Sequence, residues 1–253
     1  MYTLERSSFQ DKCAIITGAT SGMGKQIALD LARQGANVIA NGRNFEAGAL
    51  LEQEGGDTLT FKNGDVSDPE INRSLVKAAT DQFGKIDHIV TCAGALGIGK
   101  ITEVAEQTWK ETFATNVHSV FYLLKEALPN MSKGGSIVLM GSVAAFHAFP
   151  NHPAYSASKG ALIALVRQIA LDYGPDIRIN LVCPAQVKTP LLEDSVRAFP
   201  NPQRILEDTA AKLPLKRLGT TTDISNMTQF LLSEQSAWVT GSCFNIDGGF
   251  LAT

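Results

Sequence analysis

The sequence predicts an α/β fold in which a doubly wound parallel sheet of about seven strands is flanked by helices. Short apolar runs alternate with segments of helical hydrophobic period along the chain. Helices of this length between strands indicate parallel βαβ crossovers. The 253 residues show no linker-like change in composition, so we expect a single domain over residues 1–253.

The individual elements follow from where these patterns start and stop. The expected strands cover residues 13–17, 37–40, 58–63, 88–92, 136–140, 178–182 and 243–246. The expected helices cover residues 24–34, 45–54, 69–83, 103–128, 155–173 and 222–232. In folds of this class, ligands bind where the carboxyl ends of the strands meet the following turns.

The composition argues against several classes of function. The formal net charge is −3 and hydrophobic residues make up 44%, which gives a sizeable core but no footprint for nucleic acid or an anionic membrane. No run approaches about 18 apolar residues, and the first ten residues lack an apolar signal segment. Four widely spaced cysteines outside any Cys/His cluster indicate free thiols, a reducing cytoplasmic location and no metal site.

The first strand runs into a glycine-rich turn, Thr17-Gly-Ala-Thr-Ser-Gly-Met-Gly24. Gly18, Gly22 and Gly24 allow a tight turn and a close approach of the backbone to a ligand. The N-terminus of the following helix offers free N–H groups and the positive end of its dipole to a pyrophosphate. A purely structural turn is the alternative, but three glycines between the first strand and the first helix favour a Rossmann-type dinucleotide turn.

The second strand ends at Asn41-Gly42-Arg43. In dinucleotide-binding folds an acidic residue at this strand end holds the free ribose 2′-hydroxyl of NAD, whereas an arginine accommodates the 2′-phosphate of NADP. The acidic residue is missing here, and the guanidinium fork of Arg43 suits a phosphate. The sequence therefore favours NADP over NAD, the alternative for Arg43 being an exposed turn position.

Tyr155 and Lys159 lie four residues apart in an expected helix, and Ser142 lies thirteen residues before the tyrosine. Residues i and i+4 share one helix face. One positive charge at about 4 Å, in an effective dielectric of about 20, supplies roughly the 4 kcal/mol that moves a phenol pKa from about 10 to about 7. Such a tyrosine exchanges a proton with an alcohol or a carbonyl near neutral pH. Taken alone, the pair is more simply an aromatic residue followed by a solvated lysine, so its context decides.

Residues 189–217 interrupt the alternation of strands and helices. Four prolines and mixed charges follow a strand end in this stretch. Ligands bind beyond strand carboxyl ends, and long insertions in compact domains are usually functional. We therefore expect a substrate lid with short helices, the alternative being a surface excursion without a role.

These features together resemble the short-chain dehydrogenase/reductase family from about residue 9 to residue 250, and within it the 3-oxoacyl-reductase-like members. Further motifs carry the resemblance: Asp65-Val66 beside the adenine ring, Thr91-Cys-Ala-Gly94 at a strand end, a Pro184-to-Thr189 turn near the nicotinamide, and the terminal region 240–249 used in family oligomers. The departures from the family pattern are Thr91 and Cys92 in place of asparagines and Ala185 in place of a glycine.

The resemblance implies a cofactor site and a catalytic set. The implied cofactor-binding residues are Gly18, Thr20, Ser21, Gly22, Met23, Gly24, Arg43, Asp65, Val66, Cys92, Ala93, Gly94, Tyr155, Lys159, Pro184, Val187 and Thr189. The implied catalytic residues are Asn116, Ser142, Tyr155 and Lys159.

The resemblance also gives each catalytic residue a role. Tyr155 would be the general acid/base, and Lys159 would lower its pKa and bind the nicotinamide ribose. Ser142 would hold the substrate oxygen, the alternative being a strand-end serine that satisfies the backbone. Asn116 would anchor a water molecule that links Lys159 to solvent, the alternative being a helix residue satisfied locally.

The expected function is the interconversion of a ketone and a secondary alcohol with NADP(H), or with NAD(H) as the less favoured cofactor. The expected substrate-pocket walls are residues 95–98, 143–149, Gln186 and 189–217, with Phe146 and Phe149 as aromatic members. Such walls suit a hydrophobic ketone or alcohol, but sugar, polyol, steroid-like and 3-oxoacyl substrates stay open. His147 and His152 are near the pocket mouth without an assigned role.

A catalytically silent dinucleotide-binding redox sensor or scaffold is the alternative function. Silent relatives usually lose the tyrosine or the lysine, and both are present here. The partner is therefore expected to be a small molecule. The helices 103–128 and 155–173 carry more apolar positions than one buried face requires, and by the resemblance they would form a homotetramer or a homodimer.

Overall fold

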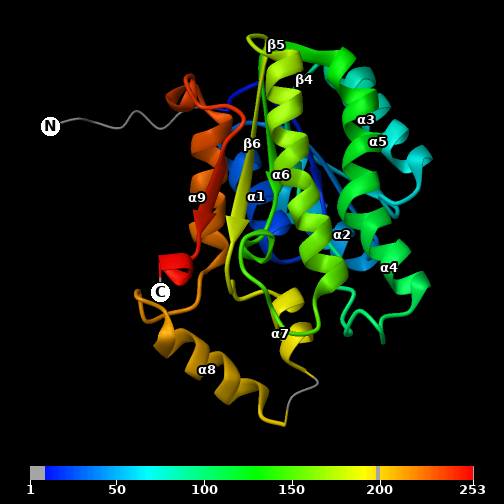
Figure 1. Cartoon of the computed structure of the whole chain (residues 1–253). Coiled ribbons are helices and arrows are strands. Elements are labelled where there is room, and N and C mark those ends of the chain that lie inside the picture. Colours follow the sequence, from blue (N-terminus) through cyan, green and yellow to red (C-terminus); the bar gives the residue numbers. More distant parts are fainter. Residues whose placement is uncertain (1–8, 198–199, 253) are drawn as a thin grey trace, which may run out of the picture.

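A computed structural model describes residues 9–197 and 200–252 of the chain. Seven parallel strands form one sheet in the order β3-β2-β1-β4-β5-β6-β7 (Figure 1). The strands are β1 (Cys13–Thr17), β2 (Asn37–Gly42), β3 (Leu59–Asn63), β4 (Ile86–Thr91), β5 (Met131–Met140), β6 (Ile177–Pro184) and β7 (Cys243–Ile246). The order reverses between β1 and β4, so the predicted doubly wound α/β fold is confirmed.

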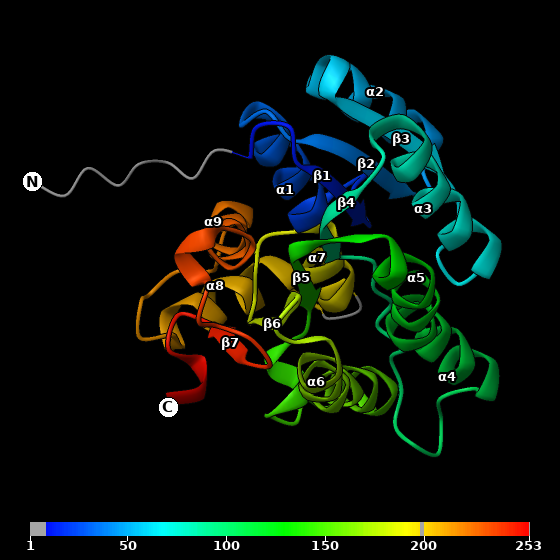
Figure 2. The ribbon, with the colours of Figure 1, turned by 90° about the horizontal axis from the view of Figure 1, so that it is seen from above.

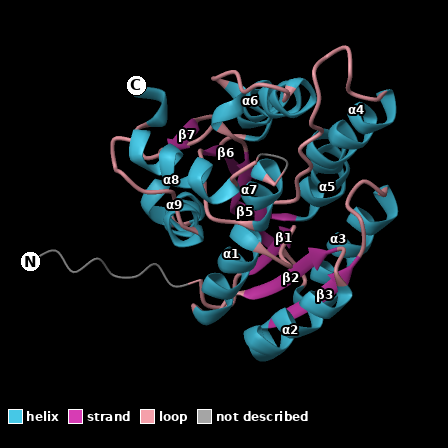
Figure 3. Cartoon of the chain, turned by 90° about the horizontal axis from the view of Figure 1, so that it is seen from below, coloured by secondary structure: helices cyan, strands magenta, loops and turns pink. Residues whose placement is uncertain are grey.

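Helices cover both faces of the sheet (Figures 2 and 3). They are α1 (Gly22–Arg33), α2 (Phe45–Gly55), α3 (Pro69–Phe83), α4 (Glu106–Phe113), α5 (Ser119–Ala127), α6 (Pro153–Tyr173), α7 (Pro190–Val196), α8 (Pro202–Lys212) and α9 (Thr221–Leu232). One core cluster joins α1 and α9 to the sheet, and a second joins α3, α5 and α6 to the opposite face.

Strand β1 shows why both faces are buried. Ala14 and Ile16 belong to the core cluster under α1, whereas Cys13 and Ile15 belong to the cluster under α3 and α6. Successive side chains of a strand point to opposite faces, so a central parallel strand between two helix layers has to be apolar throughout. This arrangement produces the continuous apolar runs from which the strands were predicted.

The expected helix over residues 103–128 starts later, at Glu106, and contains an irregularity that was not predicted. Helices α4 and α5 are separated by a π-helical turn, Ala114–His118. A π-turn closes an i→i+5 hydrogen bond and so adds a residue to the helical repeat, which a hydrophobic period does not reveal. The turn brings Asn116 to a fully buried position, 1% exposed.

The α7–α8 segment confirms the short helices expected between residues 189 and 217, of which residues 198–199 lie outside the described part of the chain. Figure 1 shows both helices beyond the arrowheads of the central strands. Thr189 and Asn201 cap them through side-chain hydrogen bonds to backbone amides, and a proline follows each cap. A proline at the first helical position lacks only an N–H that has no partner there, so these prolines begin helices rather than break them.

The described residues include no helix that is long and apolar enough to cross a bilayer. They also include no group of three or more side chains arranged to hold a metal ion. The four cysteines are free thiols, with Cys13 and Cys183 fully buried. Of the first ten residues, for which no signal segment was expected, residues 1–8 lie outside the described part.

Candidate active site

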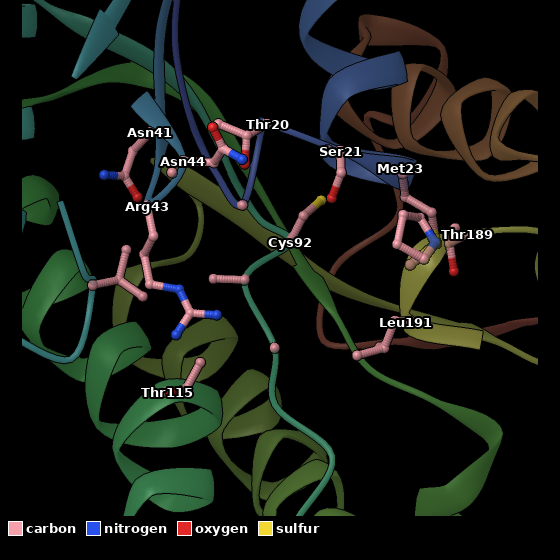
Figure 4. A pocket seen from close by; sticks show the side chains of 18 of the residues that line it. Thr20, Ser21, Met23, Asn41, Arg43, Asn44, Cys92, Thr115, Thr189 and Leu191 are labelled. Carbon is pink, nitrogen blue, oxygen red and sulfur yellow. The ribbon is translucent and has the colours of Figure 1, made fainter. Parts of the chain in front are cut away.

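Two cavities meet at the carboxyl edge of the sheet. The first, which we call the glycine cleft, has a volume of about 320 Å³ and opens over the ends of β1, β2, β3 and β4 (Figure 4). Its lining contains these residues predicted from the sequence: Gly18, Thr20, Ser21, Gly22, Met23, Gly24, Arg43, Asp65, Val66, Cys92, Ala93, Gly94 and Thr189. It also contains Pro190, Leu191 and Asp194, which were expected at the substrate pocket, and five residues that were not predicted: Asn41, Gly42, Asn44, Gly64 and Thr115.

The glycines of the turn are required first by the packing of the chain. Gly18 has a φ of +64°, and a Cβ there would lie 2.5 Å from the backbone nitrogen of Ala93. A Cβ on Gly24 would lie 2.3 Å from the carbonyl oxygen of Gly18. These glycines therefore let the turn fold back on itself and onto the end of β4, which forms the floor of the cleft.

The start of α1 fits a pyrophosphate. Its N-cap residue, Ser21, makes no side-chain hydrogen bond to the helix. The first amides of a helix have no partner within it, and the dipole places positive charge at that end. The glycine cleft thus offers backbone donors and a positive potential where a dinucleotide needs them.

Arg43 extends into the glycine cleft from the end of β2 (Figure 4). Its side chain is 75% exposed, and its Nη1 lies 3.7 Å from a carboxylate oxygen of Asp65. Burial raises the pKa of Asp65, but hydrogen bonds from Ser67 and the charge of Arg43 outweigh it and hold that pKa below its usual range. Asn72 of α3 donates to the carbonyl of the neighbouring Val66 at 2.8 Å, which fixes this turn beside the cleft.

The second cavity, which we call the tyrosine chamber, has a volume of about 400 Å³. Its lining includes Tyr155 and Ser142, together with Leu192, Val196 and Leu206 of the α7–α8 segment. Most of its other lining residues are apolar: Met23, Leu96, Val143, Ala144, Phe149, Pro150, Pro184, Ala185, Val187 and Leu191. A chamber of this kind suits an apolar ligand with a few polar groups.

The two cavities divide the predicted site residues. Pro184, Val187 and Tyr155, expected at the cofactor, line the tyrosine chamber, and their contact with a cofactor stays a prediction. Phe146, expected in the pocket wall, is 48% exposed and lines neither cavity. Of residues 95–98, only Leu96 lines the chamber. The cavities share a border made of Met23, Thr189 and Leu191.

Tyr155, Lys159 and Ser142 come together as their spacing predicts. Tyr155 and Lys159 lie in the first two turns of α6, with the lysine Nζ 5.7 Å from the centre of the tyrosine ring. Ser142 follows β5, and its Oγ accepts a hydrogen bond from the amide of Ala144 at 3.1 Å. Lys159 is 4% exposed and donates to the carbonyl of Met140 at 2.8 Å.

The electrostatics of the three residues differ in part from expectation. Burial raises the pKa of Tyr155 above its usual value of 10, while a hydrogen bond with the Ser142 side chain acts in the opposite sense. Burial lowers the pKa of Lys159 from 10.5 to about 8. Within the protein alone, the serine is therefore the group that lowers the tyrosine pKa, and the lysine charge is itself opposed by desolvation.

Asn116 is hydrogen-bonded to residues distant in the chain, and not locally as its alternative interpretation stated. Its Oδ1 accepts from the Ala95 amide at 2.8 Å, and its Nδ2 donates to the Ala95 carbonyl at 2.9 Å and to Ser158 Oγ at 2.9 Å. Ser158 in turn donates to the carbonyl of Tyr155 at 2.7 Å. Asn116 thus ties the loop after β4 to the helix that carries the tyrosine, and the water-anchoring role stays a prediction.

The departures from the family pattern are accommodated without strain. The amide of Cys92 donates to the Thr17 carbonyl at 3.2 Å, so backbone contacts join the ends of β1 and β4 where the family has asparagines. Ala185 is not among the residues with positive φ in the described part of the chain. Thr189, expected at the nicotinamide amide, donates its hydroxyl to the Val187 carbonyl at 3.1 Å.

Fold and site define a dinucleotide-dependent oxidoreductase. The family model described as enoyl-(acyl carrier protein) reductase matches residues 18–251. An uncharacterized oxidoreductase of Thermotoga maritima is 38% identical, with 97% of this chain and 99% of that protein covered. A trihydroxynaphthalene reductase of Colletotrichum orbiculare is 31% identical, covering 97% and 91%.

A solved structure agrees with these relatives. The short-chain dehydrogenase/reductase of Brucella melitensis, described as a glucose/ribitol dehydrogenase, superposes with a TM-score of 0.92 at 29% identity over 96% of this chain and 98% of that one. The chain belongs to the short-chain dehydrogenase/reductase family, whose members are NAD(P)(H)-dependent oxidoreductases.

Proposed function

We propose that this oxidoreductase interconverts a ketone and a secondary alcohol in the tyrosine chamber, with Tyr155 as the proton donor and acceptor. The observation that carries the proposal is that Tyr155 and Ser142 both line an otherwise mostly apolar chamber, with the serine side chain close enough to lower the tyrosine pKa. That chamber borders the glycine cleft through Met23, Thr189 and Leu191. A substrate carbonyl held by the two hydroxyls would face the cleft.

The glycine cleft would hold the dinucleotide. The first turn of α1 would bind its pyrophosphate, and the turn at Asp65 and Val66 would lie beside its adenine. The nicotinamide, when bound, supplies or accepts the hydride. The protein's part is to place the substrate carbon at the border between the two cavities.

Each catalytic residue then handles the substrate oxygen or the tyrosine. Ser142 Oγ would hold the oxygen in line with Tyr155, whose hydroxyl gives it a proton in reduction and takes one in oxidation. Lys159 Nζ would favour the tyrosinate and hydrogen-bond the nicotinamide ribose. Asn116 would hold the loop after β4 and the start of α6 in register.

NADP(H) is proposed as the preferred cofactor because of Arg43. Its guanidinium lies at the strand end where the 2′-phosphate is held in such folds, and the corresponding acidic residue is absent from β2. Asp65 beside Arg43 offsets part of its charge. NAD(H) is therefore the less favoured cofactor.

The catalytically silent sensor or scaffold is not favoured, since the tyrosine, serine and lysine lie together in one buried site. The cytoplasmic location stays a prediction. Exposed apolar side chains on α5 and α6, Phe121, Leu171 and Tyr173, support assembly through these helices. We propose a homotetramer or homodimer, and light scattering that returned a monomer would contradict it.

A turnover screen tests the proposed function. The purified protein would be incubated with a panel of cyclic, aliphatic and hydroxylated ketones and with NADPH or NADH, and loss of cofactor fluorescence would be followed. We expect turnover of at least one ketone with NADPH. Binding of NADPH without turnover of any ketone, or of any alcohol in the reverse direction, would favour the silent sensor.

A further inference from the structure

The structure separates two histidines that the sequence left without a role. His147 lines neither cavity and packs edge-on against Phe149 and Phe250, at ring distances of 5.3 and 4.9 Å. His152 lines the tyrosine chamber, and its ring lies 6.3 Å from the ring of Tyr155. Only His152 is placed to meet a substrate.

The tautomer of His152 is fixed by its backbone neighbour. The Nδ1 atom lies 2.6 Å from the carbonyl oxygen of Pro150. A carbonyl oxygen only accepts hydrogen bonds, so Nδ1 must carry the proton and donate it. In the neutral ring, Nε2 is then an acceptor, and the described residues provide no donor for it.

The ring is also held in position. Phe149 meets it at 6.2 Å, edge to face, and Phe149 is itself stacked on Phe250 at 5.6 Å. An imidazole fixed by one hydrogen bond and a row of rings presents its remaining nitrogen at a defined place. A bound substrate displaces water from His152 Nε2. If the substrate offers no donor in return, this nitrogen is desolvated without gaining a hydrogen bond, and binding is weaker.

We propose that His152 is a specificity-determining residue that accepts a hydrogen bond from a hydroxyl group close to the reacting carbonyl. The preferred substrates would then be hydroxyketones, or the diols that correspond to them, and not plain ketones. The proposal rests on the proposed function, because the tyrosine marks where the carbonyl lies. The remaining walls of the chamber would contact the apolar part of the same molecule.

Matched ketone pairs test the proposal. The specificity constant kcat/KM would be measured with NADPH for 2-hydroxycyclohexanone against cyclohexanone and for hydroxyacetone against acetone. We expect the wild-type protein to favour the hydroxylated member of each pair by about five- to tenfold, which is what one net hydrogen bond provides. In His152→Phe this ratio should fall to about one, and in His152→Gln, which keeps an acceptor, it should partly return.

His147→Phe is the matched control, since it keeps a ring against Phe149 and Phe250 and should leave the ratio unchanged. A ratio that survives His152→Phe, or a wild-type preference for plain ketones, overturns the inference and leaves the proposed function intact. If the His152 variants do not fold, the wild-type preference alone still decides. Failure of the wild-type protein to reduce any ketone in either pair or in the wider screen would instead overturn the proposed function.

Discussion

The glycine cleft and the tyrosine chamber lie side by side but are built differently. The cleft is formed by strand ends and the turns that follow them, with backbone contacts as short as the glycines allow. The chamber is formed by the loop between β5 and α6, by the end of β6 with the residues that follow it, and by the α7–α8 segment, and its lining is mainly apolar side chains. The cleft therefore depends on the backbone of the sheet, whereas the chamber depends mainly on side chains from loops and short helices. Substitutions in the cleft should mainly change stability and cofactor binding, and substitutions in the chamber should mainly change turnover and substrate selectivity.

The largest expected effect is on turnover, from a substitution of Tyr155 in the tyrosine chamber. Tyr155→Phe removes the proton-transferring hydroxyl and keeps the ring, so kcat should fall by about a hundred- to ten-thousandfold. The affinity for NADPH, measured by fluorescence titration, should be unchanged because the glycine cleft is intact. Substantial turnover in this variant would contradict the proposed mechanism.

The next effect concerns the cleft as part of the fold. Gly18→Ala places a Cβ 2.5 Å from the Ala93 nitrogen at a φ of +64°, so we expect a loss of about 2–5 kcal/mol in the free energy of unfolding. Urea denaturation would measure it. The control is Gly160→Ala in α6, where a Cβ meets nothing within 4 Å and stability should rise by about 0.5–1 kcal/mol. Equal stabilities of the two variants would refute this account of the turn.

Low pH should destabilise the fold through a buried histidine on β4, the strand that ends at the glycine cleft. His88 of β4 is 5% exposed, and burial lowers its pKa from 6.5 to about 4. In the unfolded chain the His88 imidazole binds a proton below pH 6.5, whereas in the folded chain it binds one only below about pH 4. The contribution of His88 to the free energy of unfolding is therefore greatest above pH 6.5. It falls by roughly 3 kcal/mol as the pH falls toward 4.

Urea denaturation at pH 7, 6 and 5 would measure this loss. His88→Gln should flatten the dependence of stability on pH in that window, because glutamine does not titrate. Asp87, Lys12, Lys85 and Arg178 act on His88 electrostatically and are kept in the variant. An unchanged slope in His88→Gln would assign the acid sensitivity to other groups.

A smaller effect tests the cofactor preference. Arg43→Ala should raise KM for NADPH by about tenfold, since an exposed guanidinium–phosphate contact contributes on the order of 1–2 kcal/mol. The KM for NADH should change little. Steady-state kinetics with both cofactors would measure this, and equal changes would remove Arg43 from the 2′-phosphate site.

The smallest effect separates the two cavities directly. Leu206 of α8 lines only the tyrosine chamber, whereas Leu191 of α7 lines both cavities. Leu206→Ala should change kcat/KM for bulky ketones by about three- to fivefold without altering KM for NADPH, and Leu191→Ala should alter both. If Leu206→Ala also weakened NADPH binding, the two cavities would not be separable units.

The parts predicted correctly from the sequence are those fixed by local chemistry. Gly18, Gly22 and Gly24 mark a turn that other residues could not form, and Tyr155 and Lys159 share a face because of the helical repeat. Asn44 and Gly64 were missed although they also follow strand ends, so a consistent use of that rule would have found them. Thr115 carries no such signal, because helix packing alone brings it to the cleft.

The sequence by itself determined the order of strands and helices, the glycine turn and the oxidoreductase family, because each depends on short motifs that can be read in order along the chain. Only the tertiary structure decided which residues share a cavity. It introduced the π-turn that buries Asn116, placed Pro184 and Val187 in the lining of the chamber, and distinguished His152 from His147. These outcomes depend on contacts between distant segments and on buried polar groups finding partners, which no local pattern specifies.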